Sequence, residues 1–199
     1  MYPMRGIFPL KRVIRGGGGT LRSVSPDWEL SLTRAIRREM SANTQPPRKT
    51  SESGTRDGAS SPERLTADNE RVVRRLIEEG FNQGNLNVLE EVLDPDFVEH
   101  QQLPPGVPPT RAAVGAIIRA LRTGFPDFHL AIESIDAVDD RVWLRLRATG
   151  TQKGPFMGNR PTGRAMSIDV MDAVRVRRGR ITEHWGVPDN GTLLEQLGL

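Results

Sequence analysis

The sequence predicts an α+β fold for residues 67–199, with three helices, then a strongly curved antiparallel sheet, then a short C-terminal helix. Two observations predict it. Between positions 68 and 124 apolar residues recur every three or four residues, as on one face of a helix, whereas between 129 and 187 they alternate with polar ones, as in strands. Helices and strands segregated along the chain are typical of this fold class. Helices lying across the concave side of a curved sheet would enclose a pocket.

Residues 1–66 have a different composition from the rest of the chain. They carry 12 Lys or Arg and 6 Asp or Glu, whereas residues 67–199 carry 16 and 19. Residues 42–62 are rich in Ser, Thr, Pro, Gly and charge, which predicts a disordered basic extension. A short helix is possible at residues 26–40, either as a docking helix for a partner or without a fixed role.

Charge and composition also exclude several classes of protein. The folded part is mildly acidic, so we expect no binding of nucleic acid. No cysteine is present, which excludes disulfides and thiolate metal sites. No apolar run reaches the roughly 18 residues that span a membrane, and the N-terminus lacks the apolar core of a secretory signal. We therefore expect a cytoplasmic protein without membrane contact.

Three helices are expected before residue 125. Their apolar faces are Val72, Val73, Leu76, Ile77 and Phe81, then Leu86, Leu89, Val92 and Leu93, then Val114, Ile117, Ile118 and Leu121. Gly80 and Gly84 bracket the end of the first helix, and Pro95 follows the second. Thr110 is expected to cap the third, which Gly124 and Pro126 end. Residues 97–100 predict a short strand before a Pro-rich loop.

Four strands are expected at residues 129–138, 141–151, 165–176 and 180–187, followed by a helix at 192–197. Residues 177–179 predict a three-residue hairpin loop with Gly179 at the position that needs positive φ. Val176 would then face Arg180, which places Asp172 directly opposite His184. Side chains directly opposite in antiparallel strands have Cβ atoms about 4.5–5.5 Å apart.

A set of short motifs occurs in a characteristic order along residues 69–199. They are Phe81-Asn82-Gln83-Gly84-Asn85, Asp94-Pro95-Asp96-Phe97-Val98-Glu99-His100, Phe125-Pro126-Asp127, Ala148-Thr149-Gly150-Thr151, Gly154-Pro155-Phe156-Met157-Gly158 with Pro161-Thr162-Gly163, Gly179-Arg180-Ile181-Thr182-Glu183-His184-Trp185 and Leu193-Leu194-Glu195-Gln196-Leu197-Gly198. In this order they resemble the SnoaL-like polyketide cyclases and ester cyclases of the NTF2-like fold. The resemblance implies a cone-shaped domain with an inner pocket.

One departure from that family concerns its acid/base residues. In the aldol-type cyclases the last long strand carries a catalytic Asp shortly after the Glu/Asp-His pair, and that position is Gly186 here. A histidine that the cyclases use on the preceding strand falls at Asp172. The two residue types are therefore partly exchanged in this chain.

The paired Asp172 and His184 are the first candidates for catalysis. A carboxylate beside an imidazole can orient the ring and raise its pKa, and such a dyad can act as a general acid/base. The alternative is a structural Asp–His pair at the end of the sheet. His100 is the second candidate, as a group that polarises the substrate oxygen, with a rim histidine that only binds the loop as its alternative.

Other polar residues are expected to have structural roles. His129 is expected to be exposed, and Asp189 to cap a turn or helix. Alternation places Asp169, Glu183 and Trp185 on the face opposite to Asp172 and His184, and it points Arg145 and Arg147 outward. An exposed Trp185 on that outer face favours a homodimer interface.

Apolar side chains are expected to line the pocket. Its predicted wall is Leu76, Val114, Ile117, Leu144, Leu146, Val170 and Val174, with Phe156 and Met157 as a lid. Ordinary core packing is the alternative for each of them. No metal site is expected, because none of the three histidines has i, i+4 spacing. No phosphate-binding loop or nucleophile elbow is present, and we expect no cofactor.

The leading hypothesis is cofactor-independent acid/base chemistry on a small apolar carbonyl or ester substrate. His184, Asp172 and His100 would perform it, in a cyclase-, isomerase- or hydratase-type reaction. The alternative is a non-catalytic module that binds a small molecule or dimerises. What separates the two hypotheses is whether Asp172 and His184 point into an accessible cavity.

Overall fold

The computed structural model describes residues 62–103 and 106–199. The predicted extension lies outside these ranges apart from its last five residues, and so does the possible helix at 26–40. The helices are α2 (Pro62–Arg75), the π-helix η1 (Leu76–Asn82), α3 (Val88–Val92), α4 (Arg111–Gly124) and α5 (Asn190–Leu197). The strands are β1 (Leu93–Glu99), β2 (His129–Val138), β3 (Arg141–Thr151), β4 (Ala165–Arg177) and β5 (Arg180–Pro188).

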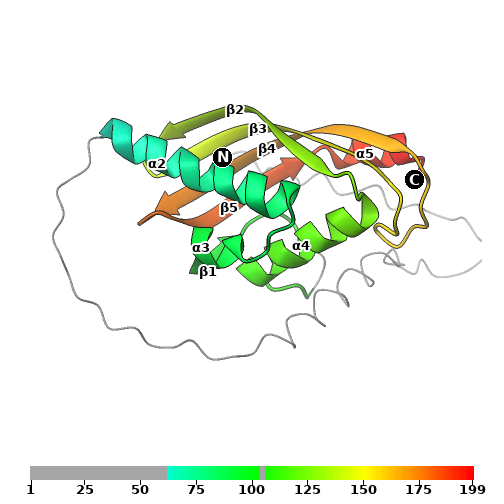
Figure 1. The fold of residues 1–199 in the computed structure, drawn as a ribbon, viewed down its shortest axis with the longest axis horizontal. Helices are drawn as coiled ribbons and strands as arrows, with labels where there is room; N and C mark the ends of the chain where they lie inside the picture. The colour runs from blue at the N-terminus through cyan, green and yellow to red at the C-terminus, as the bar shows by residue number, and fades with distance from the viewer. Residues whose placement is uncertain (1–61, 104–105) are drawn as a thin grey trace, which may run out of the picture.

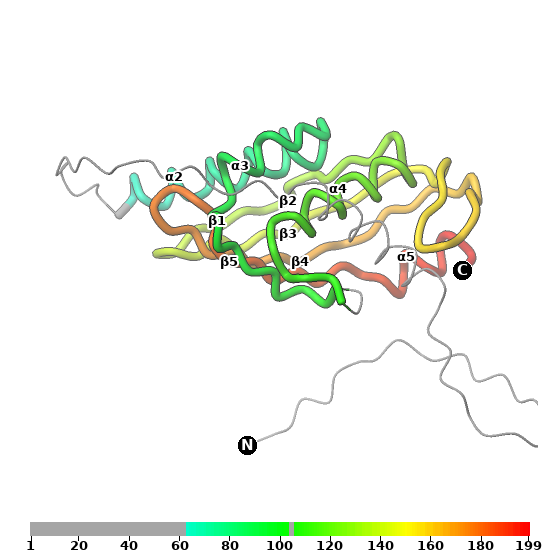
Figure 2. Tube along the Cα trace, turned by 90° about the horizontal axis from the view of Figure 1, so that it is seen from below, coloured from blue at the N-terminus to red at the C-terminus, as the bar shows by residue number. Residues whose placement is uncertain are grey.

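The strands form one curved, open sheet in the order β1-β5-β4-β3-β2. Helices α2 and α4 lie in front of this sheet in Figure 1, and the turned view in Figure 2 keeps α2 and α3 on one side of β4 and β5. We call the helix-covered face the inner face and the opposite one the outer face. This arrangement confirms the α+β prediction.

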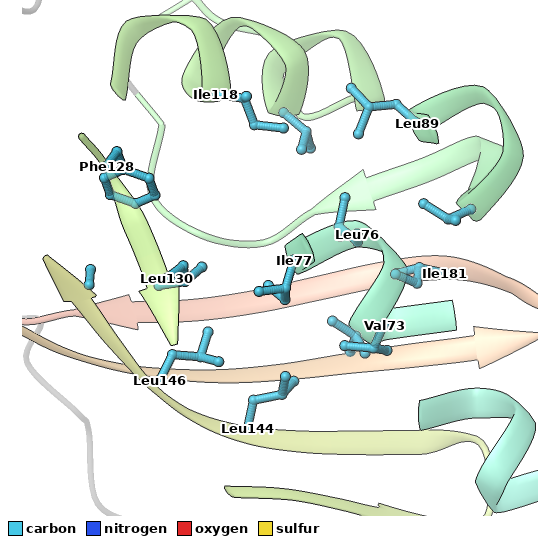
Figure 3. Packing of buried hydrophobic residues seen from close by; sticks show 14 of the residues in the cluster. Val73, Leu76, Ile77, Leu89, Ile118, Phe128, Leu130, Leu144, Leu146 and Ile181 are labelled. Carbon is cyan, nitrogen blue, oxygen red and sulfur yellow. The ribbon is translucent and has the colours of Figure 1, made fainter. Parts of the chain in front are cut away.

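The core fills the space between the helices and the inner face. Figure 3 shows Leu76 and Ile77 reaching between Ile118 of α4 and the strand residues Leu144 and Leu146. Leu146 and Ile118 are 0% and 1% exposed, respectively. Burial of such side chains contributes about 1.5–3 kcal/mol each, so this layer holds the helices on the sheet.

Two elements differ from the sequence prediction. The first helix begins at Pro62 rather than near Asp68, and its last seven residues form a π-helix that ends at Asn82, between Gly80 and Gly84 as predicted. The sheet is not wholly antiparallel, because β1 pairs in parallel with β5 along its outer edge. Thr110 stands at the N-cap of α4 as expected, but its side chain makes no capping hydrogen bond.

The β4–β5 hairpin also differs from its prediction, in loop length and in register. Arg177 pairs with Arg180, so the loop has two residues, Arg178 and Gly179, both with positive φ (52° and 71°). Positive φ at both positions defines the tight hairpin turn that matches strand twist. A bulge between Arg175 and Val176 then shifts the register again. Asp172 therefore faces Gly186, and His184 faces Val174.

Candidate functional site

The imidazole of His184 lies on the inner face between two carboxylates. Its Nδ1 is 2.8 Å from both carboxylate oxygens of Glu99. Its Nε2 is 3.4 Å from Oδ2 of Asp172. The side chains of His184, Asp172 and Glu99 are 19%, 14% and 3% exposed, respectively, so the cluster is largely shielded from water.

Strand pairing brings these three residues together. The parallel register of β1 and β5 aligns Glu99 with His184. Across the β4–β5 hairpin, Asp172 faces Gly186, two residues beyond His184 on the same face. Diagonal neighbours on one face of a sheet remain within reach of long side chains. The predicted Asp172–His184 contact is therefore present, although the two residues are not direct cross-strand partners.

The surroundings of His184 favour its protonated form. Burial alone lowers the pKa of an imidazole, but the hydrogen bonds and charges of Asp172 and Glu99 outweigh it and raise the pKa of His184 to about 10. The ring is then an imidazolium at neutral pH. In that form the ring cannot accept a proton, so a general base in this cluster has to be one of the carboxylates.

Gly186 leaves the space beside this cluster free of a side chain. A Cβ at this position would lie 2.5 Å from Oε1 of Gln101, 2.8 Å from Cε1 of His184 and 2.9 Å from Oδ1 of Asp172. Oδ1 of Asp172 is buried and has no hydrogen-bond partner among residues 62–103 and 106–199. A buried acceptor without a partner is rare and marks a place where a ligand atom could bind.

His100 does not join this cluster. Its ring stacks on Trp185 of the outer face, with centroids 4.4 Å apart, and its Nε2 is 3.0 Å from Oε2 of Glu183. The hydrogen bond from His100 is the main cause of the lowered pKa of Glu183. The sheet separates His100 from His184, because successive side chains of a strand point to opposite faces. The structure therefore does not bring His100 together with Asp172 and His184.

Two Glu-His dipeptides thus lie side by side in neighbouring parallel strands. Glu99 of the first dipeptide binds His184 of the second on the inner face, and Glu183 binds His100 on the outer face. The inner pair is buried, whereas the His100 side chain of the outer pair is 36% exposed. Glu99 is not among the residues that the sequence predicted for the site. Alternation with Phe97, which is 3% exposed, could have placed it on the inner face.

Most residues of the predicted pocket wall belong to the packed core. Leu76, Val114, Leu144, Leu146 and Val174 are buried in one cluster, and Val170 packs against it. Ile117 is partly exposed on α4. Of this set, Leu144, Val170 and Val174 are the inner-face neighbours of Asp172 on β3 and β4. They place an apolar surface directly beside its carboxylate.

The predicted lid lies far from this cluster. Phe156 packs edge-on against Phe125, with ring centroids 4.9 Å apart, and Met157 occupies the following tight turn with φ of 51°. This loop ends at Ala165, seven positions before Asp172 on β4, which is roughly 23 Å of strand. Phe156 is thus an anchor for the loop at the opposite end of the sheet.

The outer face contains a hollow of about 300 Å³. Its side-chain lining on that face is Ser134, Asp136, Trp143, Arg145, Met171, Ala173, Trp185 and Val187. Trp143, Met171 and Val187 are 52%, 54% and 71% exposed, respectively. As predicted, Trp185 and Glu183 lie on this face, and Asp169 does too, in an ion pair with Arg147 at 2.9 Å. The outer face is therefore apolar at its centre and charged around it.

The remaining sequence predictions concern single residues. Asp189 caps α5, since its carboxylate accepts hydrogen bonds from the backbone N–H and the hydroxyl of Thr192 at 2.9 and 2.6 Å. His129 is exposed at the start of β2. Within residues 62–103 and 106–199, no three His, Cys, Asp or Glu side chains are grouped so as to hold a metal ion. In the same ranges no helix is long and apolar enough to cross a membrane.

Comparison with known proteins identifies the class to which this fold and site belong. Residues 71–197 match the model of the SnoaL-like polyketide cyclase family. Nogalonic acid methyl ester cyclase from Streptomyces nogalater is 26% identical over 120 residues, which are 59% of this chain and 89% of that protein. Aklanonic acid methyl ester cyclase DauD from Streptomyces sp. strain C5 is 28% identical over 136 residues, 64% of this chain and 80% of that protein.

The crystal structure of wild-type IdmH, a proposed polyketide cyclase from Streptomyces antibioticus, is also similar. It is 36% identical, superposes with a TM-score of 0.59, and the match covers 66% of this chain and 99% of IdmH. The chain belongs to the SnoaL-like polyketide cyclase family. Its domain has the NTF2-like fold of that family, and relatives are named as ester cyclases.

Proposed function

We propose that the protein catalyses cofactor-independent carbon–carbon bond formation in a small apolar carbonyl or methyl ester substrate, with Asp172 as the base. The observation that carries this proposal is the buried cluster of Asp172, His184 and Glu99 on the inner face. The relatives named as methyl ester cyclases support the substrate class. The cytoplasm remains our prediction for the location of the protein.

The proposed step is a proton transfer followed by an intramolecular aldol reaction. Asp172 takes a proton from the carbon next to a carbonyl, and the C–H electron pair moves into an enolate. The enolate carbon attacks a second carbonyl of the same molecule, and the new alkoxide takes the proton back from Asp172. Negative charge moves from Asp172 to the enolate while the His184 imidazolium stays close to both, so the site stabilises the charge throughout.

Deuterium uptake from D2O tests whether Asp172 is the base. We expect the wild-type chain to accelerate exchange in at least one member of a panel of ketones and keto methyl esters, and Asp172→Asn to lower that rate at least about 100-fold. Asp169→Asn is the matched control, because Asp169 lies on the same strand but on the outer face, with its side chain 52% exposed. Equal rates for the wild type and Asp172→Asn would refute the assignment.

A non-catalytic binding module is the second candidate. It is favoured by Gly186, because this chain has no acid/base side chain at the position where the aldol-type cyclases carry their catalytic Asp. The same panel separates the two functions. Substrates that shift NMR signals of residues around Asp172 but never exchange faster than in buffer would favour a binding module.

A homodimer is our proposal for the assembly, with two outer faces packed together. The exposed apolar centre of Trp143, Met171 and Val187 is what such an interface would bury. Several charges around it are paired within the chain, as in Arg147–Asp169 and Arg175–Glu183. Paired charges lose less on desolvation than single ones, so the face suits a second copy of itself.

Light scattering after gel filtration tests the dimer. We expect the wild-type chain to have twice the mass of one chain and Met171→Lys to have the mass of one, because a buried lysine charge opposes association. Leu65→Lys is the control, since Leu65 is 46% exposed on α2, away from the outer face. A wild-type monomer, or a dimer that survives Met171→Lys, would contradict the proposed interface.

A further inference from the structure

Glu99 is the most deeply buried carboxylate of the inner-face cluster. Its side chain is 3% exposed, and both of its oxygens are 2.8 Å from Nδ1 of His184. The backbone N–H of Gln101 donates a further hydrogen bond to Oε1 of Glu99 at 2.9 Å. Strand register holds the pair in place, because Glu99 and His184 are aligned across β1 and β5.

We infer that Glu99 is a positioning residue that fixes the His184 ring and keeps both ring nitrogens protonated, with Nε2–H directed at Asp172. Its importance for turnover rests on the proposed function, whereas its effect on His184 does not. The charged groups acting on His184 in the described part of the chain are Asp172 from β4 and Glu99 from β1.

The donors and acceptors around the ring determine its protonation state. A neutral imidazole has one N–H donor and one acceptor nitrogen. An acceptor nitrogen 2.8 Å from two carboxylate oxygens would be repelled, so Nδ1 carries a proton. In a neutral ring Nε2 would then face Oδ2 of Asp172 with its lone pair, again an acceptor against an acceptor. The doubly protonated ring removes this conflict.

Burial strengthens the same conclusion. A buried carboxylate without a compensating charge is strongly unfavourable, and the described part of the chain places His184 as the cationic partner of Glu99. The imidazolium compensates Glu99 from one side and Asp172 from the other. Loss of the Glu99 charge should therefore lower the pKa of His184. It should also leave the Nδ1–H of the ring with a weaker hydrogen-bond acceptor.

Glu183 offers a matched comparison within the same two strands. It also binds a histidine, with Oε2 3.0 Å from Nε2 of His100, but it lies on the outer face. Glu99→Gln and Glu183→Gln are thus the same substitution at two Glu–His pairs on opposite sides of the sheet. Of these two glutamates, only Glu99 has a side chain that contacts the imidazole of His184.

The experiment is a pH titration of the histidine side-chain nitrogens by NMR in the full chain. We expect both ring nitrogens of His184 to be protonated at pH 8 in the wild type. Glu99→Gln should lower the pKa of His184 by about two pH units, as removal of an adjacent opposite charge does. Glu183→Gln should leave it at its wild-type value, and Glu99→Asp should restore part of the loss.

Two outcomes would overturn the inference. A neutral His184 at pH 8 in the wild type would do so even if Glu99→Gln fails to fold. An unchanged pKa of His184 in folded Glu99→Gln would do so as well. The titration needs no substrate, so a lowered pKa without any deuterium exchange would refute the proposed function and leave the role of Glu99 intact.

Discussion

Raising the pH from 7 to 10 is expected to lower the free energy of unfolding by up to about 1.4 kcal/mol per pH unit through His184 alone. The pKa of His184 is about 10 in the folded chain, against an ordinary value of 6.5. Between these values the folded state holds a proton that the unfolded state has released. The stabilisation is therefore complete below about pH 6.5 and is lost as the pH rises through about 10.

Urea denaturation of the full chain at pH 6.5, 7.5, 8.5 and 9.5 measures this dependence. His184→Gln should change the slope, because the imidazole that holds a proton in the folded chain between pH 6.5 and 10 is then absent. His129→Gln is the control, since it removes an exposed imidazole at the start of β2. Identical slopes in the wild type and His184→Gln would show that His184 is not the source of the pH dependence.

The fold was largely predictable because the apolar period changes once, from helical to alternating, near residue 125. The parallel pairing of β1 with β5 was not predictable from the sequence. Its partner residues lie more than 80 positions apart, as in Glu99 and His184, and the strand includes Pro95, which interrupts the pattern of a regular strand. Only tertiary packing selects such a distant partner.

The Asp172–His184 contact was predicted with the correct face and the wrong register. The two-residue turn shifts the pairing by one position, and the bulge that leaves Thr182 unpaired shifts it by one more. A shift of one residue exchanges the faces of a strand, whereas a shift of two restores them. The two deviations therefore cancel in side-chain direction, and the contact becomes diagonal.

Glu99 and His100 show how local pattern and residue chemistry can conflict. The family resemblance favoured His100, which ends a short strand beside the Pro-rich loop, as a histidine at the pocket. The alternation of β1 favours Glu99, since Phe97 and Glu99 are, as whole residues, 3% and 6% exposed while Val98 is 39% exposed. The face that a residue occupies decides whether its chemistry can be used at all.

A substitution in the loop between β3 and β4 is expected to have the second large effect on stability. Gly154→Ala should lower the free energy of unfolding by about 3 kcal/mol, as overpacking does where neighbours cannot move. A Cβ at this position would lie 2.0 Å from the backbone oxygen of Thr123 and 2.9 Å from its carbonyl carbon. The backbone of α4 is the obstacle, so no side-chain rotation relieves the contact.

Gly154 also anchors the loop to that helix end. Its N–H donates to the carbonyl of Gly124 at 2.9 Å, as does the N–H of Lys153. A displaced residue 154 would lose this bond and pull Phe156 away from Phe125, which is 0% exposed. The loop and the core layer beneath it should therefore lose their packing together in this variant.

Gly191→Ala is the matched control for this prediction. Gly191 lies in the first turn of α5, and the nearest atom to an added Cβ is Oδ1 of Asp189 at 3.6 Å, an ordinary contact. Alanine there should change the free energy of unfolding by no more than about 1 kcal/mol, towards greater stability. Urea denaturation of Gly154→Ala and Gly191→Ala measures the free energy of unfolding of both variants. Equal stability of Gly154→Ala and the wild type would mean that the loop can lift away from α4 at little cost.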